Sequence, residues 1–246
     1  MNSPKTHLAN AKFYDKVICC GQRVFDMLRM HISEDRLVVV NNAVPIPEIV
    51  GDEVQAQRER TRNKIGITQS DIAVLSIGRL VHQKGYDILL DAFSMVSREH
   101  PQAMLILAGD GQERARLEQQ AQRLGIGEKV KFLGVVMDVA QLYLASDMYV
   151  NSSRYEGLPM TLLEAMSYKK CVIASAIAEN AEIIDHGKTG MTALPEDPGS
   201  LAQTMSLVIA DRDLRDMLGQ AGYEFLRNNY SIDKHCKALE EIYLAQ

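Results

Sequence analysis

The chain has 246 residues, a net charge of −5 and 46 % hydrophobic residues, which is ordinary for a globular protein with one large or two small α/β domains. Acidic and basic residues are mixed and no long basic run is present, which argues against a nucleic-acid partner. No apolar stretch approaches the roughly 20 residues that span a bilayer, and residues 1–16 lack the apolar core of a secretory signal. We therefore expect a cytoplasmic protein.

The first 50 residues contain one strand–helix–strand pattern: VICCG (17–21), QRVFDMLRMHI (22–32) and RLVVV (36–40). This unit is too short to be a domain. The following segment, NNAVPIPEIVGDE, has two prolines and several turn-forming residues, so we interpret it as a linker. Residues 53–66 are expected to form a polar helix.

From residue 72 onward, short apolar runs alternate with segments of helical periodicity. The runs are continuously apolar, as in parallel strands that are covered on both faces. We therefore predict an α/β fold with a doubly wound, mostly parallel Rossmann-like sheet and helices on both faces. The predicted strands are 72–78, 103–109, 129–134, 147–153, 171–175 and 191–195; the predicted helices are 84–99, 112–124, 137–145, 158–169, 199–210, 212–228 and 233–245.

The four cysteines, Cys19, Cys20, Cys171 and Cys236, form no CxxC pair and have no metal-like histidine spacing. We interpret them as reduced thiols that behave as small hydrophobes.

Sheets of this kind bind ligands outside the carboxyl ends of their strands, so the turns there are the informative places. YEGLPMTLLEAM (155–166) follows one strand and is the strongest motif. Its Pro159 suits the first turn of a helix, whose free N–H groups near Met160 and Thr161 would face the crevice and attract a diphosphate. Two carboxylates beside a phosphate site, Glu156 and Glu164, suggest acceptors for sugar and ribose hydroxyls.

GRLVHQKG (78–85) follows the first strong strand. Arg79 and Lys84 would reach the same crevice, where a guanidinium and an ammonium suit the two phosphates of a nucleoside diphosphate. The alternative is a solvated basic loop. His82 lies between the two cations, and we interpret it as a loop residue rather than a catalytic one.

From about residue 13 to its end, the chain resembles the C-terminal, nucleotide-sugar-binding half of family-4 glycosyltransferases of the GT-B fold. The resemblance rests on SIGRLVHQKGYDILLDAF, LILAGDGQE, the continuous stretch VKFLGVVMDVAQLYLASDMYVNSSRYEGLPMTLLEAM and EIIDHGKTG, which occur in the family's order. The GDG turn (109–111) alone would be a weak signal.

The resemblance implies roles for individual residues. Arg79 and Lys84 match the pair that binds the diphosphate and offsets charge on the departing nucleotide. Glu156 matches the glutamate that contacts the donor sugar, and Glu164 matches the one that accepts from the ribose. The expected catalytic residues are therefore Arg79, Lys84 and Glu156.

The remaining donor contacts follow from the same resemblance. Backbone groups near Val135 and Val136 match those that pair with the base, and Gly157, Met160 and Thr161 belong to the donor-binding turn. The family is retaining, binds no metal and uses no cofactor, and UDP is its common nucleotide. Open alternatives are that Glu164 is a plain surface residue, that Ser152 and Ser153 only cap the turn, and that His186 is structural.

The chain departs from the family in three places. Residues 1–50 match only the last piece of the N-terminal acceptor domain plus the linker, so we assign residues 51–246 to the C-terminal domain. The linker reads Asn-Ala-Val-Pro at 42–45 instead of Asn-Gly-Val-Asp. The small residues that follow EAM in the family are replaced at 167–171, and the family's later glycine-rich turn is replaced at 178–181. That later turn usually lies near the donor site, so the donor's identity is in doubt.

The leading hypothesis is a transferase that moves a hexose or N-acetylhexosamine from a nucleotide sugar to a glycan or lipid-linked acceptor in polysaccharide biosynthesis. Such an enzyme would work in the cytoplasm at the inner face of the cell membrane, with peripheral membrane contact through the N-terminal domain. The alternative is a non-catalytic nucleotide-sugar-binding module. A Rossmann dehydrogenase is disfavoured because GRLVHQKG lacks the GxGxxG pattern. In the family, the apolar residues of 17–40 belong to a sheet that the acceptor domain supplies. Without that sheet, this segment is expected to mediate self-association or to stay mobile.

Overall fold

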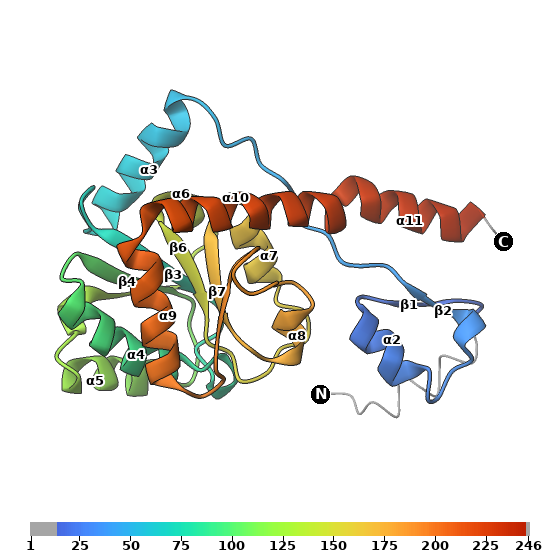
Figure 1. Ribbon diagram of the computed structural model, residues 1–246, viewed down its shortest axis with the longest axis horizontal. Coiled ribbons are helices and arrows are strands. Elements are labelled where there is room, and N and C mark those ends of the chain that lie inside the picture. The colour runs from blue at the N-terminus through green and yellow to red at the C-terminus, as the bar shows by residue number, and fades with distance from the viewer. Residues whose placement is uncertain (1–13, 245–246) are drawn as a thin grey trace. The chain divides into compact units, whose positions relative to one another are not determined.

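The computed structural model describes residues 14–244 and forms two compact units (Figure 1). Unit 2 is Ile46–Arg227, and unit 1 combines the segments before and after it. The expectations that rest on residues 1–13, including the missing secretory signal, lie outside the described residues. Within the described part of the chain, no helix has both the length and the apolar character needed to cross a membrane.

Unit 2 is built on a six-stranded sheet in which every pairing is parallel, in the order β5-β4-β3-β6-β7-β8. All five residues of β7 are buried, as its continuous apolar run predicted. The predicted parallel sheet is therefore confirmed. The strands are β3 (Ile72–Ile77), β4 (Ala103–Ala108), β5 (Val130–Gly134), β6 (Met148–Asn151), β7 (Cys171–Ser175) and β8 (Met191–Ala193).

Helices cover both faces of this sheet, as predicted. Because parallel crossovers are right-handed, α4 and α5 lie on one face and α6 and α7 on the other. The helix α9 packs against α4, and α3 packs against α6. The helices are α3 (Asp52–Lys64), α4 (Tyr86–Glu99), α5 (Arg114–Arg123), α6 (Ala140–Ala145), α7 (Met160–Ser167), the short unpredicted α8 (Ala178–Ala181), α9 (Pro198–Ala210) and α10 (Arg212–Asn229), with 3-10 turns η2 (His82–Lys84) and η3 (Gly127–Lys129).

A buried ionic cluster joins α3 to the start of β6. Asp147 accepts hydrogen bonds from Arg58 Nη2 at 2.5 Å, Arg62 Nη1 at 3.3 Å and the Ala73 backbone N–H at 2.7 Å. The Arg62 side chain is fully buried. Burial acts to raise the pKa of Asp147, but the charge of Arg58 and the other donors outweigh it and lower that pKa. The cluster therefore fixes α3 against the amino-terminal edge of β3 and β6.

Unit 1 contains a small two-stranded parallel sheet. Its elements are β1 (Val17–Cys19), α2 (Gln22–Leu28), η1 (Glu34–Arg36), β2 (Leu37–Val39) and α11 (Ile232–Leu244). The helix α2 ends four residues earlier than the predicted segment. Residues from Asn228 onward also belong to this unit, whereas the predicted division placed residues 51–246 together in one domain. The assignment of residues 1–50 to a separate domain remains a prediction.

Thiol exposure differs sharply among the cysteines. Cys171 is buried and Cys236 is exposed. Burial raises the pKa of the Cys171 thiol to about 12, so its reactive thiolate form is scarce. We expect a thiol reagent at pH 8 to modify Cys236 rapidly in the folded protein and Cys171 only after denaturation. Mass spectrometry of the labelled peptides measures this, and a Cys236→Ser variant is the control; labelling of native Cys171 at a comparable rate would contradict the expectation.

Candidate active site

The order of strands in the sheet reverses between β3 and β6. The chain leaves β3 toward β4 and β5, but leaves β6 toward β7 and β8. Such a switch point opens a crevice outside the carboxyl ends of the two strands, where ligands of open α/β sheets bind. The two strongest sequence motifs follow β3 and β6, so the fold brings both of them to this crevice.

The glycines of GRLVHQKG and of the GDG turn hold two loops together, backbone against backbone. Gly109 has a φ of +137°, and a Cβ added there would lie 1.9 Å from the Gly78 carbonyl oxygen. The Leu80 N–H donates to the Asp110 carbonyl at 2.9 Å. The GDG turn, which carried little weight in the sequence, therefore supports the loop that carries Arg79.

Substitution of Gly109 by alanine is expected to lower the free energy of unfolding by about 2–3 kcal/mol, because both φ and the approach of Gly78 exclude a side chain. Gly66→Ala is the matched control, since Gly66 also has a positive φ, +70°, but open space around it. Its cost should be about 1–2 kcal/mol. Urea denaturation measures both, and equal losses would show that the close approach of the two loops is unimportant.

Lys84 and Glu156 form an ion pair in the crevice. Lys84 Nζ lies 2.7 Å from Glu156 Oε1, and the exposed fractions of the two side chains are 20 % and 5 %. The same oxygen accepts from Asn151 Nδ2 at 3.1 Å and from Ser153 Oγ at 2.6 Å. Asn151 was not identified from the sequence; its position at the carboxyl end of β6 was the available signal.

Ser152 and Ser153 both form hydrogen bonds at this site. Ser153 donates to Glu156, and Ser152 Oγ donates to the Lys84 carbonyl at 2.9 Å. Gly85 has a φ of +63°, and a Cβ there would lie 2.1 Å from the Ser152 carbonyl oxygen. The loop after β3 and the loop after β6 are thus packed together through Ser152, whereas Ser153 and its partner Glu156 lie on the same loop. A contact of either serine with a ligand stays a hypothesis.

Arg79 is exposed, and its guanidinium has no hydrogen-bond or ion-pair partner among residues 14–244. By contrast, Arg154 forms a bidentate pair with Asp87, with both N–O distances 2.9 Å. His82 contributes its carbonyl oxygen to Arg154 at 2.8 Å, in keeping with a loop residue. Arg79 is therefore the cation near the crevice whose charge remains open to a bound anion.

Two buried tyrosines fix the start of α7. Tyr149 Oη donates to Thr161 Oγ1 at 2.7 Å and lies 3.4 Å from the Ile77 carbonyl at the end of β3. Tyr143 Oη donates to Glu164 Oε2 at 2.8 Å. Burial raises the pKa of both phenols, so they stay protonated donors. The hydrogen bond from Tyr143 thus fixes the orientation of the Glu164 carboxylate, which is not freely solvated. The role of Glu164 toward a ligand remains a prediction.

The turn before α7 is open. A Cβ on Gly157 would meet nothing within 4 Å, and Met160 begins the helix directly after Pro159. After β5, Val135 is 72 % exposed. It borders a depression of about 590 Å³ that is also lined by Val136. These residues surround the carboxyl ends of the strands as predicted, and their contacts with a nucleotide remain predictions.

The match to a known family spans most of unit 2. Residues 57–225 match the family model described as glycosyl transferases group 1. The chain belongs to the group 1 glycosyltransferases. It is 30 % identical over 212 residues to an uncharacterized glycosyltransferase of Methanocaldococcus jannaschii, covering 85 % of this chain and 54 % of that protein. The chain spans about half the length of the curated glycosyltransferases it matches.

Solved glycosyltransferases share the fold. The crystal structure of HepE from Anabaena in complex with UDP and glucose matches with a TM-score of 0.87 at 23 % identity, covering 99 % of this chain and 68 % of that one. The C-terminal domain of the group 1 protein LpcC from Francisella tularensis matches with a TM-score of 0.65 at 25 % identity, covering 71 % of this chain and 93 % of that one. The resemblance to the C-terminal half of the GT-B fold is thereby confirmed.

Proposed function

We propose that this chain is the donor-binding part of a retaining, metal-independent glycosyltransferase. It would transfer a hexose or N-acetylhexosamine from a nucleoside-diphosphate sugar to a glycan or lipid-linked acceptor. The observation that carries the proposal is the pairing of Lys84 with the buried Glu156 at the strand switch point, beside the unpaired Arg79. A site of this kind offers positive charge for a diphosphate and a fixed carboxylate for sugar hydroxyls.

The proposed division of labour follows from the contacts. Lys84 has three N–H donors, so it can keep Glu156 and still bind a phosphate oxygen. Arg79 would supply the second cation. As the bond between sugar and diphosphate breaks, negative charge grows on the leaving phosphate, and both cations stabilise it.

The nucleoside would lie toward β5 and α7. Glu164 Oε2 is engaged by Tyr143, which leaves the other carboxylate oxygen to accept from a ribose hydroxyl. Backbone groups at Val135 and Val136 would meet the base at the apolar depression there. We favour UDP because the solved relative HepE binds it.

The test is calorimetric titration of the chain with UDP, GDP and ADP and with their hexose and N-acetylhexosamine esters. Micromolar binding of one nucleotide, lost in Glu164→Ala, is the expected result. The matched control is Glu128→Ala, an exposed glutamate that precedes β5 and so lies at the opposite edge of the same sheet. No binding by any nucleotide in the parent protein would contradict the proposal.

The second candidate is a binding module that holds the nucleotide sugar without transferring it. The contacts described in the crevice, Lys84 with Glu156 and Tyr143 with Glu164, suit the holding of a nucleotide sugar as well as its transfer. Release of UDP from a bound UDP-sugar, followed with and without glycan acceptors, discriminates the two. Binding without release under all conditions would support the module.

The same proposal places the enzyme in the cytoplasm at the inner face of the membrane, which it would contact through an acceptor domain. Self-association through residues 17–40 is also proposed, since Ile18, Met27 and Met30 are 41 %, 62 % and 77 % exposed. Light scattering over a dilution series should show a dimer that Met27→Lys disrupts. A monomer at every concentration would exclude it.

A further inference from the structure

A second polar cavity lies at the opposite edge of the unit 2 sheet. It has a volume of about 390 Å³ and is bordered by residues that directly precede β3, β6 and β7. The strands are four to six residues long, so about 13–20 Å separates this cavity from the donor crevice. The two sites therefore share no residue.

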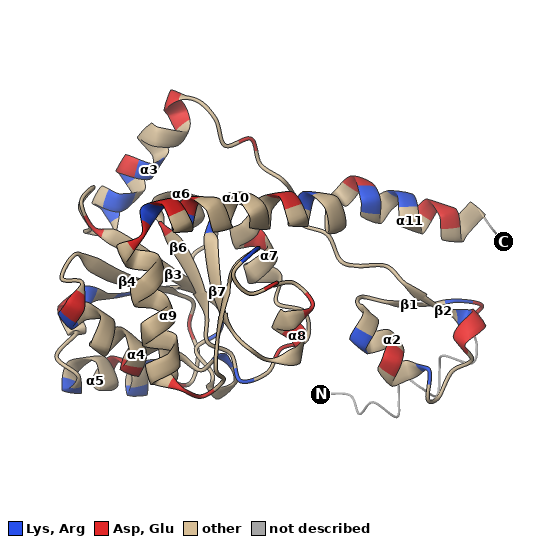
Figure 2. Ribbon diagram, in the orientation of Figure 1, with Lys and Arg blue, Asp and Glu red and all other residues tan. Residues whose placement is uncertain are grey.

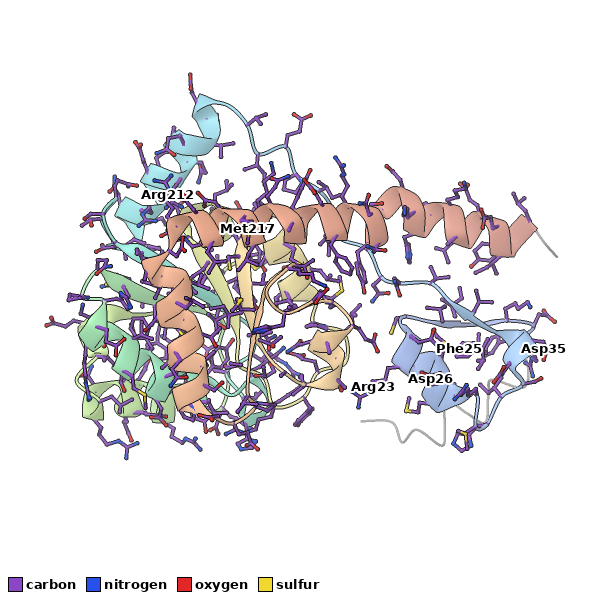
Figure 3. The ribbon with its side chains drawn as sticks, in the orientation of Figure 1. Arg23, Phe25, Asp26, Asp35, Arg212 and Met217 are labelled. Carbon is purple, nitrogen blue, oxygen red and sulfur yellow. The ribbon has the colours of Figure 1, made fainter. Side chains whose placement is uncertain are left out.

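The lining of this cavity is positively charged. Its basic residues are Arg58, Lys169, Lys170, Arg212 and Arg215, against three acidic ones, Asp71, Asp147 and Asp216. The residues come from α3, from the turn after α7 and from the first turn of α10. Figure 2 shows basic and acidic positions at the start of α10, and Figure 3 labels Arg212 there, on the side of the unit where α3 lies.

The acidic residues do not neutralise all of these cations. Asp147 is already occupied by Arg58 and Arg62, and Asp216 faces Arg212 at 3.5 Å on the exposed rim. Within residues 14–244, neither Lys170 nor Arg215 forms a close ion pair with a carboxylate, and Asp147 and Asp216 act on Lys170 only from a longer distance. Lys170 Nζ donates to the Ser146 carbonyl at 2.9 Å, and Arg215 Nη1 donates to the Val208 carbonyl at 2.9 Å.

The backbone concentrates this charge further. Arg212 and Arg215 stand in the first turn of α10, where the positive end of the helix dipole disfavours cations. Lys169 has a φ of +54°, a conformation that costs a lysine about 1–2 kcal/mol. The helix is pressed onto this turn, because a Cβ on Gly219 would lie 2.3 Å from the Lys169 carbonyl oxygen. Basic side chains that are held close together in a cavity repel one another, and a bound anion would relieve that repulsion. The arrangement therefore indicates an anion site.

We propose that this cavity binds a phosphate group, as inorganic phosphate or as the phosphomonoester of a small metabolite. The Lys170 ammonium, and the N–H groups of the Arg215 guanidinium that do not bond to the Val208 carbonyl, would donate to the phosphate oxygens. Arg212 would close the site from the rim. Burial, reinforced by Arg58, lowers the pKa of Lys170 to about 8, and a bound dianion would raise it again.

The experiment is a titration of the full chain with inorganic phosphate and with a hexose monophosphate at constant ionic strength, with chloride as the reference salt. Both the melting temperature and calorimetric heats are recorded. We expect saturable stabilisation, with affinity at least about 10-fold lower in Lys170→Met. Arg212→Met, which removes an exposed side chain and leaves folding intact, should also weaken binding. Tighter binding of the hexose monophosphate would identify the ester as the ligand.

Two controls separate this site from others. Lys188→Met removes an exposed lysine elsewhere and should leave phosphate binding unchanged. Lys84→Ala should also leave it unchanged, so failure of the proposed donor site would not affect the result. Phosphate binding that is lost in Lys84→Ala, or retained fully in both Lys170→Met and Arg212→Met, would overturn the proposal. Binding to anionic lipid vesicles without any response to phosphate would overturn it as well, in favour of a membrane contact.

Discussion

Replacing Asp147 by asparagine is expected to lower the free energy of unfolding by about 3–5 kcal/mol, as measured by urea denaturation at pH 7. The carboxylate is the negative charge that faces Arg58 and the fully buried Arg62. An amide keeps the shape but leaves a buried guanidinium without a counter-charge. It also places an NH2 group or a weaker acceptor opposite the Ala73 N–H.

The matched control for this change is Asp185→Asn. Asp185 also forms an ion pair, with Lys188 at 2.8 Å, but both side chains are more than half exposed. Exposed pairs contribute about 0–1 kcal/mol, so this variant should unfold close to the parent. Similar losses for the two variants would show that burial of the pair around Asp147 is not what makes it stabilising.

The contribution of Asp147 should also depend on pH. Its folded-state pKa is lowered, so the unfolded chain, with an aspartate pKa of about 3.9, binds the proton more readily. The stabilisation is therefore fully present above about pH 4 and is lost as pH falls through the lower folded-state pKa. Unfolding free energies of the parent and of Asp147→Asn should converge across that acidic range.

The second large effect is expected from Lys84→Ala. Loss of a charge-assisted phosphate contact should weaken nucleoside-diphosphate binding by about 1.5–3 kcal/mol, or roughly 10- to 150-fold, in calorimetric titrations. The change also leaves the Glu156 carboxylate, 5 % exposed, without its cation. We therefore expect a stability loss of about 1–3 kcal/mol in addition.

A double variant separates the two consequences. Lys84→Ala combined with Glu156→Gln removes the stranded charge, so it should recover part of the stability while binding stays weak. Lys188→Ala is the control for loss of a lysine from an exposed pair. Nucleotide affinity equal to that of the parent in Lys84→Ala would remove this lysine from the donor site.

The sheet could be predicted because its strands are buried on both faces. Runs such as IAVLSI and CVIAS are continuously apolar, and they lie where β3 and β7 were expected. Pro159 likewise marked the start of α7. The loops that carry Arg79 and Glu156 could be found for the same reason, since each directly follows one of these strands.

Other parts of the site depend on contacts between distant segments, which periodicity does not encode. No local pattern indicated that Tyr143 would lie under Glu164, 21 residues away, or that Asp147 would meet Arg62, 85 residues away. The closeness of Gly109 to Gly78 follows from the pairing of β3 with β4, and the glycines show it only after that pairing is known.

The pairing between β3 and β6 is the shortest in the six-stranded sheet. Only two residue pairs register across it, Val74 with Met148 and Leu75 with Tyr149, whereas β3 and β4 register over six. Across this seam, side chains supply much of the cohesion that backbone pairing supplies elsewhere. Amide protons of β6 should therefore exchange with solvent earlier than those of β4. A nucleotide that contacts the loops after both β3 and β6 would hold the two sides of this seam together and slow that exchange.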